Sequence, residues 1–183
     1  MIYKLMSFTS ALFFTALIIS CNSSNSNEKQ STPMQHEMHA QETTVGDQSQ
    51  TSEELAFNDQ ATEAIFQNYI AVKEALVASD TGAAQKAANQ LSKSLSENNE
   101  AVEFGDKVAK SSDIEAQRKA FSKLTKPVED LLNGTISKGT VYKDYCPMAF
   151  NEGAYWLSED KEIKNPFYGD KMLTCGSVKS EIK

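Results

Sequence analysis

Residues 112–134 read SDIEAQRKAFSKLTKPVEDLLNG, and this stretch carries the clearest fold signal in the chain. Its first four residues, 112–115, form a capping box, whose two end side chains satisfy free backbone N–H groups at a helix start. Apolar residues then recur with the period of one helix face, at Ile114, Phe121, Leu124, Val128, Leu131 and Leu132. Asn133 and Gly134 end this helix, and Pro127 inside it predicts a kink or a break.

Three earlier segments show the same helical period. The first runs from Asn58 or Asp59 to about Ser79, with apolar residues at three- and four-residue steps. Asp80 is the expected N-cap of a second helix, whose apolar face consists of Ala84, Ala88, Leu91 and Leu95. A weaker, shorter segment holds Val102, Phe104 and Val108. We therefore predict an all-α fold, with an antiparallel helical bundle of three to four helices over residues 57–139.

Residues 140–178 differ in character from the bundle. Seven of the twelve aromatic residues that follow residue 20 fall here, namely Tyr142, Tyr145, Phe150, Tyr155, Trp156, Phe167 and Tyr168. Glycine and proline punctuate the segment, so turns and short extended pieces fit it better than a long helix. We expect an irregular, aromatic-rich cap that packs on the bundle and holds Cys146 near Cys175, followed by a tail at 179–183.

Residues 1–20 have the pattern of a bacterial signal peptide. Lys4 precedes an apolar run over residues 12–19, and Ser20 stands directly before Cys21, as at a lipoprotein cleavage site. The alternative is a membrane-spanning anchor, for which the run is short. We expect acyl chains on Cys21 to anchor the protein in the membrane. Asn22 after it favours the periplasmic side of the outer membrane.

Residues 21–56 are polar and cannot bury enough apolar surface to fold, so we expect a disordered tether. It contains the sequence PMQHEMH, with Met34, His36, Met38 and His39, and these are the two histidines of the chain. Thioethers select Cu(I), and imidazole accepts copper, zinc and nickel. We predict that this arm collects copper. The alternative is a solvated linker whose composition is accidental.

The other sulfur ligands are Cys146 and Met148 in YCPMA, and Met172 and Cys175 in KMLTCG. Residues 40–145 contain no Met, His or Cys. Two thiolates and two thioethers suit Cu(I) or Ag(I), so we predict a soft-metal site. The alternative is a Cys146–Cys175 disulfide, as expected in an oxidising compartment. Closing that loop of about 29 residues would stabilise the fold by roughly 3.5 kcal/mol.

Composition excludes several classes of function. The formal net charge of −7 becomes about −8 when residues 1–20 are removed, because Lys4 is their one charged residue. Such an acidic chain is unsuited to nucleic acid. Nucleophilic catalysis needs a base, and no histidine follows His39. The C-x-x-C redox motif and the C-x-x-C-H haem motif are also absent from the sequence. We therefore predict a binding protein and not an enzyme.

Three segments carry a resemblance to a known family: AVKEALVASD, SDIEAQRKAFSKL and VYKDYCPMAFNEGAYWLSEDKEIKNPFYGDKMLTCG. Over about residues 57–178 the chain resembles the bacterial family catalogued as domain of unknown function 3347. The resemblance implies periplasmic lipoproteins, and domains attached to adaptor subunits of copper and silver efflux systems. Its motif positions here are Tyr142, Cys146, Pro147, Met148, Ala154, Trp156, Leu157, Ile163, Asn165, Pro166, Gly169, Met172, Leu173, Cys175 and Gly176. Members of the family often carry histidine in the bundle, where this chain has none.

The residues and the resemblance favour a periplasmic, membrane-anchored lipoprotein that binds Cu(I). It would serve copper tolerance or delivery to a periplasmic efflux adaptor. The rival hypothesis is a non-catalytic structural or protein-interaction module closed by a Cys146–Cys175 disulfide, with Tyr155 and Trp156 on its contact surface.

Overall fold

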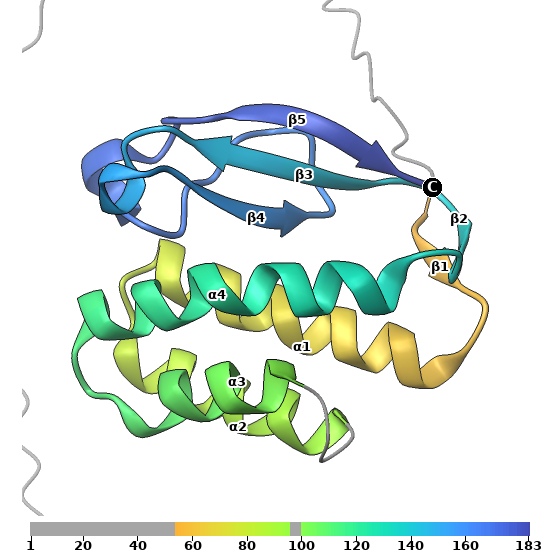
Figure 1. The fold of residues 1–183 in the computed structure, drawn as a ribbon, viewed down its shortest axis with the longest axis horizontal. Coiled ribbons are helices and arrows are strands. Elements are labelled where there is room, and N and C mark those ends of the chain that lie inside the picture. The colour runs from red at the N-terminus through yellow and green to blue at the C-terminus, as the bar shows by residue number, and fades with distance from the viewer. Residues whose placement is uncertain (1–53, 96–99) are drawn as a thin grey trace, which may run out of the picture. The chain divides into compact units, whose positions relative to one another are not determined.

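The computed structural model describes residues 54–95 and 100–183, which form four α-helices and two antiparallel sheets (Figure 1). The helices are α1 (Gln60–Val77), α2 (Thr81–Ser94), α3 (Glu100–Lys110) and α4 (Ile114–Leu132). Figure 1 shows α1 and α4 lying between the larger sheet and the α2–α3 pair. Across this described part, no helix combines the length and apolarity needed to cross a bilayer.

The starts of α1 and α2 agree with the sequence-based prediction. Asp59 caps α1 by accepting a hydrogen bond from the Thr62 N–H at 2.8 Å. Asp80 caps α2 by accepting one from the Ala83 N–H, also at 2.8 Å. Each carboxylate satisfies an N–H group that the first turn of a helix leaves free. The helical bundle predicted from these signals is thereby confirmed as one part of the fold.

Helix α4 differs from the prediction in two details. Its N-cap is Asp113, whose carboxylate accepts from the Glu115 N–H at 2.9 Å. The predicted helix start, with Ser112 as the cap, is therefore wrong by one residue, because the side chain of Asp113 binds the free Glu115 N–H instead. The helix also continues through Pro127 as one element, so the predicted break into two pieces does not occur.

The prediction of an all-α fold is wrong, because the expected irregular cap is largely a β-sheet. Its strands are β3 (Val141–Cys146), β4 (Ala154–Ser158) and β5 (Ser177–Ile182), in the antiparallel order β4-β3-β5. Strand β5 thus extends into the segment 179–183 that was expected as a tail. A small second sheet pairs β1 (Ala56–Phe57) with β2 (Ile136–Lys138), next to the start of α1 and the end of α4.

Strand β4 lies at one edge of the larger sheet, and hydroxyl groups of α1 and α4 cover its free backbone. The Leu157 N–H donates to the Tyr69 hydroxyl at 3.1 Å, and that hydroxyl lies 2.9 Å from Thr125 Oγ1. The Thr125 hydroxyl donates to the Tyr155 carbonyl at 3.0 Å. An uncovered edge can pair with another chain, so these two hydroxyls close the edge and dock the sheet on the helices.

A row of aromatic rings joins the sheet to the helices. Trp156 is fully buried and meets Phe167 edge-on, with ring centroids 5.7 Å apart. Phe167 lies 6.3 Å from Phe121, which stacks on Tyr69 at 4.9 Å. Trp156 is therefore a core residue, which corrects its expected place on a contact surface. Tyr155 is 42% exposed.

Arg118 ties the segment after β4 to the helices. Its side chain is 4% exposed. Its Nε donates to the Pro166 carbonyl at 3.1 Å, and its Nη2 donates to the Leu76 carbonyl at 3.3 Å and to Ser79 Oγ at 2.9 Å. Its Nη1 pairs with Glu115 at 2.8 Å. A buried guanidinium needs several acceptors, and these acceptors come from three separate segments that it holds together.

Candidate functional site

Cys146 and Cys175 meet at one end of the larger sheet. Cys146 is the last residue of β3 and is fully buried, whereas Cys175 lies two residues before β5 and is half-buried. Because Tyr145 pairs with Ser177 across the β3–β5 ladder, the residues just beyond that pair are neighbours. Their Sγ atoms are 3.0 Å apart, and no disulfide joins them. The prediction that the C-terminal segment brings these two residues together is confirmed.

Asn165 fixes the position of Cys175. Its side chain is fully buried, and its Nδ2 donates to the Cys175 carbonyl at 2.8 Å. Its backbone N–H donates to the Leu173 carbonyl at 2.7 Å, and its Oδ1 accepts from the Phe167 N–H at 2.8 Å. The Cys175 N–H donates to the Met172 carbonyl at 3.0 Å. Cys175 is therefore presented from a turn whose backbone is held on both sides.

Gly176 allows the chain after Cys175 to pass close to Trp156. Its φ is +148°, and a Cβ atom at this position would lie 2.7 Å from the Trp156 ring and 3.1 Å from the Tyr145 carbonyl oxygen. A side chain would collide there, and this backbone conformation favours glycine. Glycine is thus required at position 176 by the close approach of this turn to the core.

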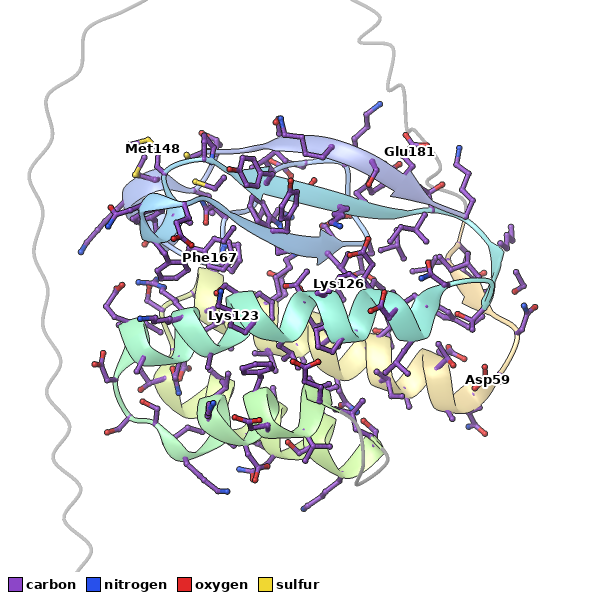
Figure 2. The ribbon with its side chains drawn as sticks, in the orientation of Figure 1. Asp59, Lys123, Lys126, Met148, Phe167 and Glu181 are labelled. Carbon is purple, nitrogen blue, oxygen red and sulfur yellow. The ribbon has the colours of Figure 1, made fainter. Side chains whose placement is uncertain are left out.

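Two methionines lie on the turns that flank the cysteines. Met148 leads from β3 into the 3-10 helix η1 (Ala149–Asn151) and is 58% exposed. Met172 ends the 3-10 helix η2 (Gly169–Met172) and is partly buried. The Tyr168 hydroxyl donates to the Met148 carbonyl at 2.7 Å and so links the two turns. Figure 2 shows the sulfur atoms drawn there gathered at the end of the sheet where Met148 is labelled. We call Cys146, Met148, Met172 and Cys175 the sulfur corner.

The pKa values of the Cys175 thiol and the Tyr168 hydroxyl are shifted at this corner. The hydrogen bond to Cys146 raises the pKa of the Cys175 thiol, and burial raises it further. Burial also raises the pKa of the Tyr168 hydroxyl, as do the nearby charges of Cys146 and Cys175 when these are ionised. An ordinary thiol is already mostly protonated at neutral pH. Cys175 is therefore a neutral thiol in the protein as it stands.

Two kinds of chemistry fit this spacing. A disulfide has its Sγ atoms about 2.05 Å apart, and two thiolates that share a tetrahedral ion at about 2.3 Å are roughly 3.8 Å apart. The observed separation of 3.0 Å lies between these values. Either state needs each sulfur atom to move by less than about 1 Å. The donor set of thiols and thioethers fits a soft monovalent ion.

Other predicted ligands fall elsewhere in the chain. Met34, His36, Met38 and His39, together with the lipidation site Cys21, lie outside the described residues. Within residues 54–95 and 100–183, no group of three or more His, Cys, Asp or Glu side chains converges to hold a metal ion. Of the predicted ligands within the described residues, Cys146 and Cys175 are in contact, and Met148 and Met172 lie on the turns that flank them.

A buried polar cluster that no local sequence pattern indicated lies between α1 and the sheet. The Lys73 ammonium is fully buried, donates to Ser158 Oγ at 3.2 Å and pairs with Glu74 at 2.8 Å. Asp144 of β3 is also fully buried, and in the described structure neither its carboxylate oxygens nor Trp156 Nε1 has a hydrogen-bond partner. Burial raises the pKa of Asp144 to about 6, and the charge of Lys73 opposes this shift.

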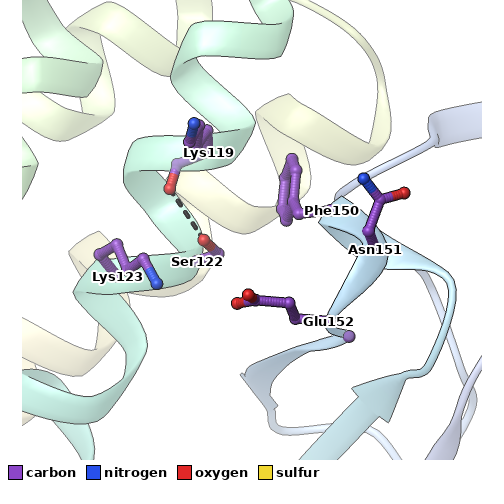
Figure 3. Close-up of a pocket in the computed structure, with 7 residues that line it drawn as sticks. Lys119, Ser122, Lys123, Phe150, Asn151 and Glu152 are labelled. Carbon is purple, nitrogen blue, oxygen red and sulfur yellow. Dashed lines mark hydrogen bonds between the residues drawn. The ribbon is translucent and has the colours of Figure 1, made fainter.

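A pocket of about 410 Å³ lies between α4 and the turn that follows η1 (Figure 3). It is lined by Lys119, Ser122, Lys123, Phe150, Asn151, Glu152 and Gly153. The Ser122 hydroxyl donates to the Lys119 carbonyl of its own helix at 2.8 Å. Ligand pockets are usually lined mainly by apolar side chains, so this mixture of charged and polar side chains marks a polar surface hollow.

Residues 65–139 match the family model described as Protein of unknown function (DUF3347). This match confirms the resemblance over those residues, and the motif positions from Tyr142 to Gly176 lie beyond it. It covers most of α1, the other three helices and β2, and it ends before the strands of the larger sheet. No curated protein and no solved structure gives a significant match to the chain.

Proposed function

We propose that the protein binds Cu(I) at the sulfur corner and serves copper tolerance or delivery to a periplasmic efflux adaptor. In this proposal it is a lipoprotein held by acyl chains on Cys21 at the periplasmic side of the outer membrane. One observation carries the metal-binding part: the Sγ atoms of Cys146 and Cys175 lie 3.0 Å apart. The exposed thioether of Met148 at the same end of the sheet offers an entry point for the ion.

The donor set favours Cu(I) or Ag(I) over harder ions. Zinc prefers four ligands drawn from Cys, His and carboxylates, and no such group converges in the described part of the chain. Thioether sulfur adds affinity for soft ions and little for zinc or magnesium. Because Met148 and Met172 flank the two thiols in sequence and on linked turns, they are the third and fourth donors in this proposal.

Anaerobic titration of the full chain with Cu(I), against bicinchoninate as the competing chelator, tests the proposal. The background variant replaces Met34, His36, Met38 and His39 by Ser, so that the arm does not contribute. On that background, replacing both Cys146 and Cys175 by Ser should lower the Cu(I) affinity at least tenfold. Thr174→Ser, an exposed change in the same turn, is the matched control and should leave the affinity unchanged. A loss of less than tenfold in the double variant contradicts the proposal.

A second candidate function is a non-catalytic interaction module closed by a Cys146–Cys175 disulfide. The short Sγ–Sγ distance favours it as well, and a disulfide is the usual fate of paired cysteines in an oxidising compartment. Mass spectrometry of periplasmic protein, alkylated without prior reduction, separates the two candidates. Peptides linked through the two cysteines, in a protein that binds no Cu(I) after reduction, support the module, whereas alkylation of both cysteines after removal of metal supports the metal site.

The membrane anchor has its own test. Growth with a labelled fatty acid should label the wild-type chain, and Cys21→Ser should remove the label and release the protein from the membrane fraction. Membrane association that survives Cys21→Ser would contradict lipid anchoring and leave the copper-binding proposal untouched.

A further inference from the structure

We propose that the sulfur corner is a redox-gated site, in which reduced Cys146 and Cys175 hold the ion and their disulfide releases it. In this proposal Cys175 reacts first with the oxidant, Cys146 closes the bond, and Asn165 holds Cys175 in range throughout. The inference rests on the proposed function, because it treats metal binding and disulfide formation as two states of one site.

The backbone around both cysteines is fixed independently of the sulfur atoms. Cys146 ends β3 and pairs with Ala154 of β4. Cys175 is held by the Asn165 side chain at its carbonyl and by the Met172 carbonyl at its N–H. Since the Sγ atoms are already 3.0 Å apart, closing or opening the pair requires only side-chain movement. The fold can therefore pass between the two states without unfolding.

The two thiols differ in access to solvent, and this difference sets the order of reaction. Cys146 is fully buried, whereas Cys175 is half-buried and follows the exposed Thr174. Thiol–disulfide exchange requires the attacking sulfur to approach its partner in line. An external oxidant therefore reaches Cys175 first. Cys146 then reacts only with the mixed disulfide that Cys175 has formed with the oxidant.

With a small disulfide RSSR as the oxidant, the steps balance. Cys175 loses its proton and attacks one sulfur of RSSR, which forms a Cys175–SR bond and releases the other half as RSH. Cys146 then loses its proton and attacks the Cys175 sulfur, which forms the intramolecular disulfide and releases the second RSH. The two cysteines are oxidised by two electrons, RSSR is reduced to two thiols, and both protons leave on those thiols.

Oxidation removes both thiolate donors, so the ion loses its strongest ligands. Binding and oxidation are then linked, and the linkage is reciprocal. Once free Cu(I) exceeds its dissociation constant, each further tenfold rise in its concentration lowers the equilibrium constant for disulfide formation tenfold. This corresponds to a change of about 30 mV in the reduction potential of the two-electron couple.

Asn165 is the positioning residue in this site. The Asn165→Asp variant keeps an oxygen that can accept from the Phe167 N–H, but it has no N–H to donate to the Cys175 carbonyl. We expect this variant to form the Cys146–Cys175 disulfide at least tenfold less favourably in a glutathione buffer. Thr174→Ser, in the same turn, should leave that equilibrium unchanged. A merely structural role for Asn165 would lower stability and leave the thiol equilibrium of the folded protein as in the wild type.

The first experiment traps the order of reaction. Full-length wild type, Cys146→Ser and Cys175→Ser are incubated without oxygen in oxidised glutathione, alkylated, and analysed peptide by peptide. We expect an internal disulfide in the wild type, a stable glutathione adduct on Cys175 in Cys146→Ser, and little adduct on Cys146 in Cys175→Ser. Equal adduct formation on both cysteines overturns the proposed order.

The second experiment tests the gate itself. Oxidised wild type, freed of glutathione, should bind Cu(I) as weakly as the variant with Ser at both cysteines, and reduction with a phosphine should restore binding. Circular dichroism should be the same in both states. If the oxidised protein binds Cu(I) with full affinity, or if the disulfide forms only when the protein unfolds, the redox gate is contradicted and the proposed function is not affected. If the reduced protein does not bind Cu(I), the proposed function fails and the gate fails with it.

Discussion

The hydroxyl of Tyr69 binds the backbone of edge strand β4 from helix α1, and Tyr69→Phe removes only that hydroxyl. In the structure the Leu157 N–H donates to Tyr69, and Thr125 donates to the Tyr155 carbonyl. The Tyr155 carbonyl is the nearer of the two carbonyls that Thr125 can reach, since the Phe121 carbonyl lies 3.5 Å away. With the Thr125 proton on Tyr155, the Tyr69 proton points to Thr125 Oγ1, 2.9 Å away. The result is one directed chain of hydrogen bonds that starts and ends on β4.

The size of the effect follows from counting the buried groups that each change leaves unpaired. We take about 1.5 kcal/mol for each buried donor or carbonyl that loses its partner. Tyr69→Phe strands the Leu157 N–H and should lower the free energy of unfolding by about 1.5 kcal/mol. Thr125→Val strands the Tyr69 hydroxyl proton and the Tyr155 carbonyl and should lower it by about 3 kcal/mol. The double variant strands only the two backbone groups of β4, which again gives about 3 kcal/mol.

Urea unfolding of the wild type, both single variants and the double variant measures these values. The two single effects sum to about 4.5 kcal/mol, so the double variant should fall short of additivity by about 1.5 kcal/mol. Tyr155→Phe is the matched control, because it removes a hydroxyl from a tyrosine that is 42% exposed. It should change stability by less than about 0.5 kcal/mol. An additive double variant would refute the directed chain, and a Tyr69→Phe effect as small as the control would refute the docking role.

Three further predictions concern stability in the reduced, metal-free protein. Asp144→Asn removes a carboxyl whose pKa is raised to about 6. Because the folded state binds that proton more tightly than the unfolded chain, wild-type stability should fall relative to the variant by about 2 kcal/mol between pH 4 and pH 7. Urea unfolding measured across this pH range would contradict this prediction if the free energies of unfolding of the wild type and the variant changed with pH in parallel. Arg118→Met strands the Pro166 carbonyl, whereas the Leu76 carbonyl keeps its hydrogen bond from the Ser79 N–H. The variant should therefore lower the free energy of unfolding by about 1.5 kcal/mol, and Lys119→Met, on the exposed side of α4, should change it by less than about 0.5 kcal/mol. Gly176→Ala should lower the free energy of unfolding by about 2 kcal/mol or more and alter the fluorescence of the single tryptophan, because the new methyl group meets its ring. Unchanged fluorescence and stability would contradict this and show that the turn can move to accommodate the methyl group.

The helical half of the fold was predictable because its signals are local. Asp59 and Asp80 cap helices from positions fixed by their own first turns, and the apolar period of α1 and α4 is visible in any window of those segments. The start of α4 was misplaced by one residue, since Ser112 and Asp113 are both good caps and only their backbone conformation selects one.

The sheet was missed because its strands lack a clean alternation of polar and apolar residues. In β3 the buried positions are occupied by Val141, Asp144 and Cys146, so a charged residue sits where an apolar one is expected. A bulge between Lys143 and Asp144 on the β5 side further breaks the period. The glycines and prolines of the segment, read as signs of irregular structure, lie in the turns between strands.

The sequence alone determined which side chains could supply soft ligands, because ligand type belongs to a side chain and is independent of its surroundings. It also indicated that Cys146 and Cys175 would meet. Only the tertiary structure decided that Asn165 holds Cys175, that Trp156 is buried, and that Lys73 and Asp144 share the interior. These are contacts between segments far apart in the chain, and their energies depend on burial and approach distances that no local window of sequence contains.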